Sequence, residues 1–444
     1  MVTLERKALA QLEDWRTTSV HKVLLVDGAR QVGKTFLIRR FGSLHYEHVA
    51  EVNLLEIEGA AKAFSSATSS DNLFTRLSLY VDAELVPHKT LIFIDEVQEA
   101  PEMITAAKFL VDNYGNQFDF VFSGSLLGVE LKGIKSWPVG YMRTITMYPL
   151  DFEEWCWANG LDSDILSLTK TQIGHCEQVD PFIHDRLMQL LHYYLAVGGM
   201  PEAVQEYVST KNLQRVRSIQ KDIVEYYRYD ITRYCSQQDV LFVRRVYDLL
   251  PSQLNQQNKR FIVSKVGKHV RVEKNENRFV WLVDAGVVIP TYNVSEPRYP
   301  LMLSGDSTLF KLFMSDVGLL AYESGMDTVK GLIGGECVNY GAIYENYVAQ
   351  ELTVCGKRVW YFRSKKHGEL DFIVDWPDGT ALPIEVKSGK NYHRHRAINN
   401  VLSVAEWGIK QGVVLHDGNV LVGKPITYLP IYAAGWLDVY MNKG

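Results

Sequence analysis

The sequence predicts an α/β protein with a parallel sheet in its N-terminal part and a second α/β domain at its C-terminal end. Two short apolar runs, residues 23–26 (VLLV) and 91–94 (LIFI), stop abruptly at polar or glycine residues, which is typical of buried parallel strands. Farther along, residues 369–375 and 382–387 carry an apolar residue at every second position on either side of a Pro-Asp-Gly turn. That period of two predicts a β-hairpin. Stretches with helical spacing lie between these strands, so helices and strands alternate along the chain.

Composition restricts the class of protein. The chain has 444 residues, of which 47% are hydrophobic and 22% charged, as in an ordinary globular protein with a sizeable core. A net charge of −5 argues against a protein coated by nucleic acid but leaves a local basic face open. The five cysteines are scattered and fit a reducing cytosol. No secretory signal and no long apolar run occurs, so we expect a cytoplasmic protein with no membrane partner.

A glycine-rich loop follows the first apolar run. Residues 28–35 (GARQVGKT) fill the pattern G-x-x-x-x-G-K-[ST] between a predicted strand and a predicted helix. Backbone N–H groups in such a loop wrap around a phosphate, and the start of the helix favours negative charge. Lys34 would reach the β- and γ-phosphates of ATP, and the Thr35 hydroxyl would hold Mg2+. The predicted ATP-binding residues of the loop are Gly28, Ala29, Arg30, Gln31, Val32, Gly33, Lys34 and Thr35.

Two further strands end in residues suited to nucleotide chemistry. Residues 90–96 (TLIFIDE) end in two acids, and ligands of parallel sheets bind at the carboxyl ends of the strands. Asp95 would help to hold Mg2+ through its water shell, and Glu96 would polarise the attacking water. The strand at 118–122 is followed by Ser123-Gly124-Ser125, whose small hydroxyl residues can sense the γ-phosphate, and Ser125 is the predicted contact. A plain strand-to-helix turn with a capping serine is the alternative interpretation.

The middle of the chain predicts helices and a DNA contact. Residues 159–237 are mostly helical in pattern and predict a lid. Residues 238–325 suggest a winged helix, in which 287–292 and 308–314 would be the wing strands. Basic residues around its middle helix favour a DNA-facing helix, with a solvated face of a packing domain as the alternative. They are Lys259, Arg260, Lys265, Lys268, His269 and Arg271.

The C-terminal hairpin predicts a polar site. Leu370, Phe372 and Val374 are expected on one face of the first strand and Asp371 on the other, while Glu369 is expected to point away. In the second strand, Glu385 and Lys387 share the face opposite the apolar residues of 382–386. The hairpin would therefore bring Asp371, Glu385 and Lys387 into one site.

Carboxylates on adjacent strands form the hard-oxygen environment that Mg2+ prefers. Asp371 and Glu385 would bind the ion, which could activate water, and Lys387 would orient that water or stabilise phosphate charge.

Several segments taken together resemble a widespread group of prokaryotic ATPases of the AAA superfamily. The resemblance runs through the Walker A loop GARQVGKT, the Walker B strand LIFIDEVQ, SGS at 123–125, PVG at 138–140 and MYPLDFEEW at 147–155. It continues in YLAVGGMPEAV (194–204), VWLVDAGVV (280–288), LFKLFMSDVGLL (309–320) and the C-terminal block. It implies an AAA-type ATPase using ATP and Mg2+, with a C-terminal domain of unknown function similar to restriction-endonuclease folds. Many relatives carry Gly-Arg where this chain has Gly140-Tyr141, which leaves open whether Arg143 is an arginine finger.

The C-terminal residues are similar to the D…(D/E)-x-K arrangement of restriction-type nucleases, and Glu345 matches the helical acid that many of them carry. The expected metal ligands there are thus Glu345, Asp371 and Glu385.

These observations predict four domains: a P-loop ATPase domain at 1–158, a helical lid at 159–237, a winged helix at 238–325 and a restriction-endonuclease-like domain at 326–444. The predicted function is an ATP-hydrolysing protein coupled to a nuclease-like domain that acts on DNA, in defence or genome maintenance. Its catalytic residues would be Glu96, Asp371, Glu385 and Lys387. The alternative is a nucleotide-switched regulator that binds DNA or protein and whose nuclease-like domain is silent. Assembly into a homo-oligomer stays open.

Overall fold

The computed structural model describes residues 3–18, 22–67, 69–81, 83–125, 137–256, 260–262, 265–266, 276–334, 340–389 and 392–441. The chain divides into two compact units. The first comprises Glu5–Tyr148 with Asp284–Gly286, and the second comprises Met1–Leu4, Pro149–Val283 and Val287–Gly444. We call them the N-terminal unit and the C-terminal unit and describe each by itself.

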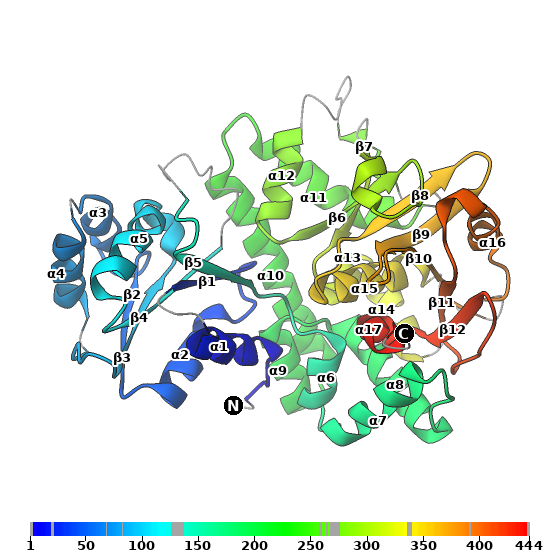
Figure 1. Ribbon diagram of the computed structural model, residues 1–444, viewed down its shortest axis with the longest axis horizontal. Helices are drawn as coiled ribbons and strands as arrows, with labels where there is room; N and C mark the ends of the chain where they lie inside the picture. Colours follow the sequence, from blue (N-terminus) through cyan, green and yellow to red (C-terminus); the bar gives the residue numbers. More distant parts are fainter. Residues whose placement is uncertain are drawn as a thin grey trace. The chain divides into compact units, whose positions relative to one another are not determined.

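The N-terminal unit is built on a five-stranded sheet, drawn in blue and cyan in Figure 1. All of its strand pairs are parallel, in the order β2-β3-β4-β1-β5, which confirms the predicted parallel α/β sheet. Its elements are α1 (Lys7–Thr18), β1 (Val23–Asp27), α2 (Lys34–His45), β2 (His48–Asn53), α3 (Ala60–Ser65), α4 (Ser70–Tyr80), β3 (Thr90–Asp95), the short helix η1 (Val97–Glu99), α5 (Glu102–Tyr114), β4 (Asp119–Gly124) and β5 (Met142–Thr146).

Both faces of this sheet are buried, which explains its continuous apolar runs. Leu24 and Val26 of β1 pack in one cluster with side chains of α1 and α2. Their neighbours Val23 and Leu25 pack in a second cluster with side chains of α3, α4 and α5. Because every strand runs in the same direction, the residues that follow β1, β3 and β4 meet at one edge of the sheet. Since β4 lies between β1 and β3, its end lies between the other two.

The C-terminal unit contains a helical part and a mixed sheet. The segment expected to be helical holds α7, α8, α9 and α10. The elements are α6 (Phe152–Ala158), α7 (Ser163–Gly174), α8 (Pro181–Val197), α9 (Pro201–Thr210), α10 (Leu213–Tyr234), α11 (Val240–Leu254), α12 (Glu276–Asp284), β6 (Val288–Val294), η5 (Leu301–Ser304), β7 (Gly305–Met314), α13 (Val317–Glu323), α14 (Met326–Gly334), α15 (Gly341–Val354), β8 (Trp360–Ser364), β9 (Gly368–Asp375), β10 (Ala381–Val386), α16 (Arg396–Leu402), η6 (Ala405–Trp407), β11 (Gly412–His416), β12 (Ile426–Pro430), η7 (Ile431–Trp436) and α17 (Leu437–Met441).

The two strands expected to form a wing belong instead to the large sheet. Its seven strands run in the order β12-β11-β10-β9-β8-β6-β7. β6 and β7 form an antiparallel pair, as expected, but β6 also pairs in parallel with β8 from Tyr292↔Trp360 to Val294↔Phe362. The end of β6, residues 292–294, is thus paired on both sides, and the β6–β7 pair continues into the large sheet. Most of the predicted DNA-facing helix, including Lys259, Lys268, His269 and Arg271, lies outside the described residues.

The hairpin expected near the C-terminus is present, with an irregularity in its first strand. β9 and β10 pair antiparallel, from Ala381↔Asp375 to Ile384↔Phe372. Against β8, however, the register shifts, so that Trp360 and Phe362 face Ile373 and Leu370. Leu370 and Ile373 consequently join the same apolar cluster, whereas the ring of Phe372 packs 5.5 Å from that of Phe313. The strict alternation expected for β9 is therefore wrong, because an extra residue lies opposite β8.

A buried aspartate joins two glycine-containing segments of the C-terminal unit, the Gly198-Gly199 turn and the start of α13. Asp316 caps α13 by accepting a hydrogen bond from the Leu319 N–H at 3.0 Å, and it accepts another from the Gly199 N–H at 2.6 Å. A Cβ on Gly318 would lie 2.3 Å from the backbone nitrogen of Gly198. Only glycine allows these backbones to approach so closely.

Throughout the described part of the chain, no helix combines the length and the apolar character needed to cross a membrane.

Candidate functional site

The glycine-rich loop leaves β1 and enters α2 through two glycines with positive φ, Gly28 and Gly33. Gly28 has φ +146° and a Cβ there would lie 2.1 Å from the Met147 carbonyl oxygen, so the loop requires glycine at this position. Gly33 has φ 92° and precedes α2, whose first turn has no side-chain cap. The N–H groups at the start of α2 thus remain available for an anion. Ala29 and Val32 are buried in the core, so they would offer a phosphate only their backbone, and Gln31 is exposed.

Lys34 points back into the loop. Its Nζ donates hydrogen bonds to the carbonyl oxygens of Gly28 and Ala29, each at 2.8 Å. Desolvation of the ammonium lowers the pKa of Lys34 to about 8, although Glu96, Asp27 and Asp95 oppose this shift. A desolvated ammonium inside a glycine loop is poised to exchange carbonyl partners for a phosphate.

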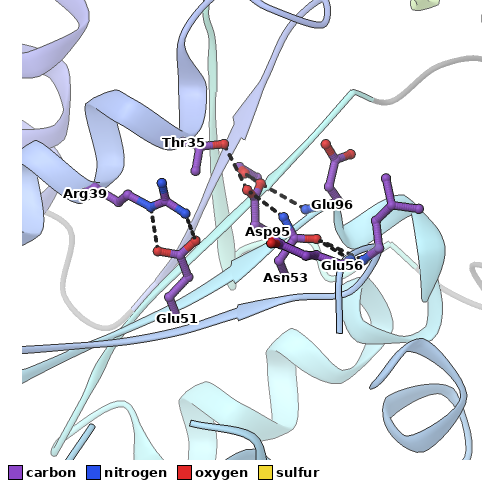
Figure 2. Close-up of polar contacts among 9 residues, drawn as sticks. Thr35, Arg39, Glu51, Asn53, Glu56, Asp95 and Glu96 are labelled. Atoms are coloured by element: carbon purple, nitrogen blue, oxygen red, sulfur yellow. Dashed lines mark hydrogen bonds and ion pairs between the residues drawn. The ribbon is translucent and has the colours of Figure 1, made fainter. Parts of the chain in front are cut away.

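Asp95 is the centre of a hydrogen-bonded group at the edge of the sheet (Figure 2). Its Oδ2 accepts from the Thr35 hydroxyl at 2.8 Å and, more weakly, from the Asn53 amide at 3.5 Å. Its Oδ1 accepts from the Glu96 backbone N–H at 3.0 Å and from the Ser123 hydroxyl. The structure therefore brings together the two predicted Mg2+ residues, Thr35 and Asp95, from the ends of different elements.

Glu96 and Ser125 complete this edge. Glu96 leaves β3 in the left-handed region, with φ 57°, and its Oε2 accepts a hydrogen bond from the Gln98 amide. Ser125 follows β4 and is buried, and its Oγ has no hydrogen-bond partner within the described part of the chain. A buried hydroxyl without a partner is costly unless a ligand supplies one. The hydroxyl thus fits the predicted contact with a γ-phosphate.

Two residues of this group, Asn53 and Gln98, were not singled out from the sequence, and Ser123 was expected near the γ-phosphate and not on Asp95. Asn53 ends β2 and bonds Asp95, Ser123 bonds the other Asp95 oxygen, and Gln98 bonds Glu96. The sequence did contain a signal for Asn53, because it is a polar residue at the carboxyl end of a parallel strand, where ligands bind. Gln98 lies in a short helix after the acids, where no pattern indicates a contact.

Arg143 is engaged within its own unit. Its Nη2 lies 2.6 Å from Asp14 Oδ2, and its Nη1 lies 3.4 Å from the Thr18 hydroxyl. The ring of Tyr141, at the position where relatives carry arginine, lies under the Lys108 ammonium at 5.4 Å. The role of Arg143 as an arginine finger stays open.

Taken together, the N-terminal residues fit a Mg2+–nucleotide complex. The fit rests on a lysine bonded to loop carbonyls, a threonine hydroxyl bonded to a buried aspartate, and a buried serine hydroxyl that has no partner among the described residues. These are the groups that a phosphate loop, a Mg2+ ion and a γ-phosphate would engage.

The C-terminal hairpin brings its three predicted residues together. Asp371 Oδ2 accepts a hydrogen bond from the Val386 N–H at 2.9 Å, and Lys387 Nζ lies 2.8 Å from Glu385 Oε1. Burial, followed by the nearby charge of Asp371, raises the pKa of Glu385 to about 7. Glu345, on α15, is buried and also contributes to this shift.

A fifth residue, not predicted from the sequence, enters this site. Lys311 of β7 is 1% exposed, and its Nζ lies 2.9 Å from Glu369 Oε1. Glu369 also lies 3.6 Å from Arg363 Nε. The expectation that Glu369 points away is therefore wrong, since residues two apart in an extended strand share a face and Glu369 stands two before Asp371. Burial alone would lower the pKa of Lys311, but Glu345, Glu369 and Asp371 outweigh it and raise the pKa.

Two of the acids of this site are paired with lysines. Within the residues that the structure describes, no group of three or more His, Cys, Asp or Glu side chains is placed to hold a metal ion. Instead, the carboxylates of Glu369 and Glu385 each contact a lysine ammonium. The charges of Asp371 and Glu345 both act on Glu385, and the metal site formed by these three residues stays a prediction.

Three family models match separate segments of the chain. Residues 20–156 match a family described as an AAA domain. Residues 188–330 and 340–433 match two families described as domains of unknown function, DUF8612 and DUF4143. The first match and the geometry of the glycine loop together support a P-loop ATPase domain of the AAA type, and with it nucleotide binding and hydrolysis.

Among solved structures, a Walker-type ATPase of Pyrococcus abyssi is 14% identical, with 72% of this chain and 96% of that chain covered and a TM-score of 0.44. The ORC1 protein of Aeropyrum pernix, solved in complex with DNA, is 13% identical, with 76% and 93% covered and a TM-score of 0.27. Drosophila ORC bound to DNA is 11% identical, with 72% and 85% covered and a TM-score of 0.25. These likenesses are too distant to assign a substrate or a partner. No curated protein matches the chain.

Proposed function

We propose that the N-terminal unit binds and hydrolyses ATP with Mg2+. The observation that carries this proposal is the 2.8 Å contact between the Thr35 hydroxyl and Asp95, beside a lysine that fills the glycine loop. Bound Mg2+–ATP supplies the γ-phosphoryl group and the cation that balances its charge. Lys34 would move from the loop carbonyls to the phosphates, and the Ser125 hydroxyl would donate to the γ-phosphate.

Glu96 is the proposed general base. Its carboxylate would polarise the attacking water, and the hydrogen bond from Gln98 would orient it. The left-handed backbone at Glu96 turns its side chain away from the line of β3, which supports a role at the edge of the sheet rather than in the core.

We further propose that the nucleotide cycle is coupled to a nuclease-like C-terminal domain that acts on DNA, in defence or genome maintenance. In the cleaving form of this proposal, Asp371, Glu385 and Glu345 would hold Mg2+ and Lys387 would stabilise phosphate charge. The close approach of Asp371, Glu385 and Lys387 on β9 and β10 supports it.

A second candidate is a nucleotide-switched regulator whose nuclease-like domain binds DNA or protein without cleaving it. We call this candidate the binding form. One observation favours it for the C-terminal domain: the Lys387 ammonium already contacts Glu385, one of the three predicted metal ligands. Both candidates keep the same ATP site.

The two candidates differ in what they do to DNA. The experiment incubates the full chain with labelled single-stranded, duplex and branched DNA, with and without Mg2+ and ATP. The cleaving form predicts Mg2+-dependent cuts that disappear in Asp371→Ala. The binding form predicts that ATP changes the amount of DNA that the wild type retains but not the amount that Lys34→Ala retains. It also predicts that no DNA is cut. If ATP changes neither cleavage nor retention, the proposed coupling to DNA is wrong.

A further inference from the structure

Arg6 joins the glycine-rich loop to the segment that follows β5. Its Nη1 donates a hydrogen bond to the Val32 carbonyl oxygen at 2.9 Å, and its Nη2 donates one to the Tyr148 carbonyl oxygen at 2.6 Å. Val32 lies inside the loop, and Tyr148 lies two residues after the end of β5. All three residues belong to the N-terminal unit. Because a guanidinium presents its donors in a rigid planar fork, Arg6 holds the two carbonyls in a fixed arrangement.

Helix α1 holds Arg6 in place. The Arg6 carbonyl oxygen accepts a hydrogen bond from the Leu9 N–H at 3.0 Å, in the first turn of that helix. Farther along α1, Leu12 and Trp15 are buried in the same apolar cluster as Val32 of the loop. The helix and the loop are therefore packed together, and the guanidinium is presented to the loop by an ordered helix.

The bond to Val32 fixes the orientation of the next peptide group. The Val32 carbonyl and the Gly33 N–H belong to one planar trans peptide, in which they point in opposite directions. Because the carbonyl is bonded to Arg6, the Gly33 N–H points away from Arg6. Gln31 and Gly33, on either side of Val32, have positive φ of 65° and 92°. Left-handed residues in a turn make successive N–H groups converge on an anion.

Gln31 gives independent evidence that the loop is held from outside. A residue other than glycine in the left-handed region is strained, and it persists only where its surroundings fix the backbone. The Gln31 side chain is exposed, whereas the carbonyl of the following residue is the one that Arg6 bonds. The guanidinium thus supplies a constraint at the point where the loop is strained.

We propose that Arg6 is a positioning residue of the ATP site and that its bond to both carbonyls holds the Gly33 N–H ready for a phosphate. Glycine-rich loops of this kind bind the α- and β-phosphates through backbone N–H groups, so the effect of Arg6 falls on ADP as well as on ATP. The chemical step depends instead on Glu96, which follows β3. This inference rests on the proposed ATPase and deepens it.

Three variants of α1 test the proposal. Arg6→Met removes the guanidinium and keeps a long unbranched side chain. Arg6→Lys keeps the charge, but a single ammonium lacks the fork that bonds both carbonyls. Arg16→Met is the matched control, because it makes the same substitution near the other end of α1, where the exposed Arg16 lies 5.5 Å from the centre of the Tyr46 ring. Thermal unfolding checks that each variant is folded.

The measurement is the binding of a fluorescent ADP analogue with Mg2+ to the full chain, which gives both the Kd and the number of sites. KM and kcat for ATP are measured in parallel. For Arg6→Met we expect Kd and KM to rise at least about tenfold, as for a lost hydrogen bond to a charged group. The number of sites should stay at the wild-type value, and kcat at saturating ATP should change by less than about twofold. Arg6→Lys should show a smaller rise in Kd, and Arg16→Met should match the wild type.

A wild-type Kd in folded Arg6→Met would overturn the proposal. So would a loss of binding sites with an unchanged Kd, because Arg6 would then only stabilise the fold. If Arg6→Met does not fold, Arg6→Lys decides: a wild-type Kd in that variant means that the bond to both carbonyls does not position the loop. A wild type that binds no nucleotide would instead refute the proposed ATPase itself.

Discussion

Replacing Thr35 by valine tests the contact that organises the nucleotide site. Valine keeps the shape and the branched Cβ of threonine and removes only the hydroxyl that donates to Asp95 Oδ2 at 2.8 Å. Asp95 is 3% exposed, so water does not replace the lost donor. A hydrogen bond to a charged group contributes about 1.5–3 kcal/mol to stability. Thr35→Val should therefore destabilise the nucleotide-free N-terminal unit by that amount, which lowers its unfolding temperature by about 3–12 °C.

A double-mutant cycle isolates this contact from other effects of the substitution. In an Asp95→Ala background the acceptor is missing, so adding Thr35→Val should cost about 0.5 kcal/mol or less. Thr35→Ser retains the hydroxyl and should behave like the wild type in both backgrounds. Native-state hydrogen exchange of peptides from β1 and β3 reports on the N-terminal unit alone. An equal cost of Thr35→Val with and without Asp95 would refute the contact and the arrangement of the site derived from it.

Three further predictions concern stability, each measured by urea or thermal unfolding. Gly318→Ala should cost about 1–3 kcal/mol or more, because the added Cβ would lie 2.3 Å from a backbone nitrogen, whereas Gly334→Ala, with no described atom within 4 Å of its Cβ, should be neutral. Burial raises the pKa of Asp316 from 3.8 to about 6, so this carboxyl binds its proton more tightly in the folded protein. Its contribution to stability is present below pH 4 and is lost as the pH rises through 6. Relative to Asp316→Asn, the wild type should lose up to about 3 kcal/mol from pH 4 to pH 7, and parallel pH profiles would contradict this. Arg39→Met should change stability by less than about 1 kcal/mol despite its 2.7 Å ion pair with Glu51, since Arg39 is 58% exposed.

The nucleotide site was largely predictable because its signals are local. The apolar runs before Gly28 and Glu96 predicted β1 and β3, and a parallel sheet necessarily gathers the ends of its strands at one edge. The contacts among Thr35, Asp95 and Ser123 then follow from the position of β4 between β1 and β3. That strand order is a long-range property, and no residue pattern within a strand specifies it.

The C-terminal site was predicted only in part, for the same reason. The turn at Pro377-Asp378-Gly379 indicated the hairpin, and the hairpin places Asp371 beside the end of β10. Lys311 was missed because its strand was correctly expected but was assigned to a wing. Local alternation shows that a strand exists without showing which sheet it joins. The extra residue in β9 is likewise set by pairing with β8, which the sequence of β9 does not reveal.

The most direct test of the central claim is ATP turnover by Glu96→Gln compared with the wild type. Glutamine keeps the size of the side chain and the partner Gln98 but removes the carboxylate that would polarise water. We expect Glu96→Gln to bind Mg2+–ATP as the wild type does and to hydrolyse it at least about tenfold more slowly. Lys34→Ala is the control, which should lose binding as well. Wild-type turnover by Glu96→Gln, or unchanged ATP affinity and hydrolysis in Lys34→Ala, would contradict the assignment of this edge of the sheet as an ATPase site.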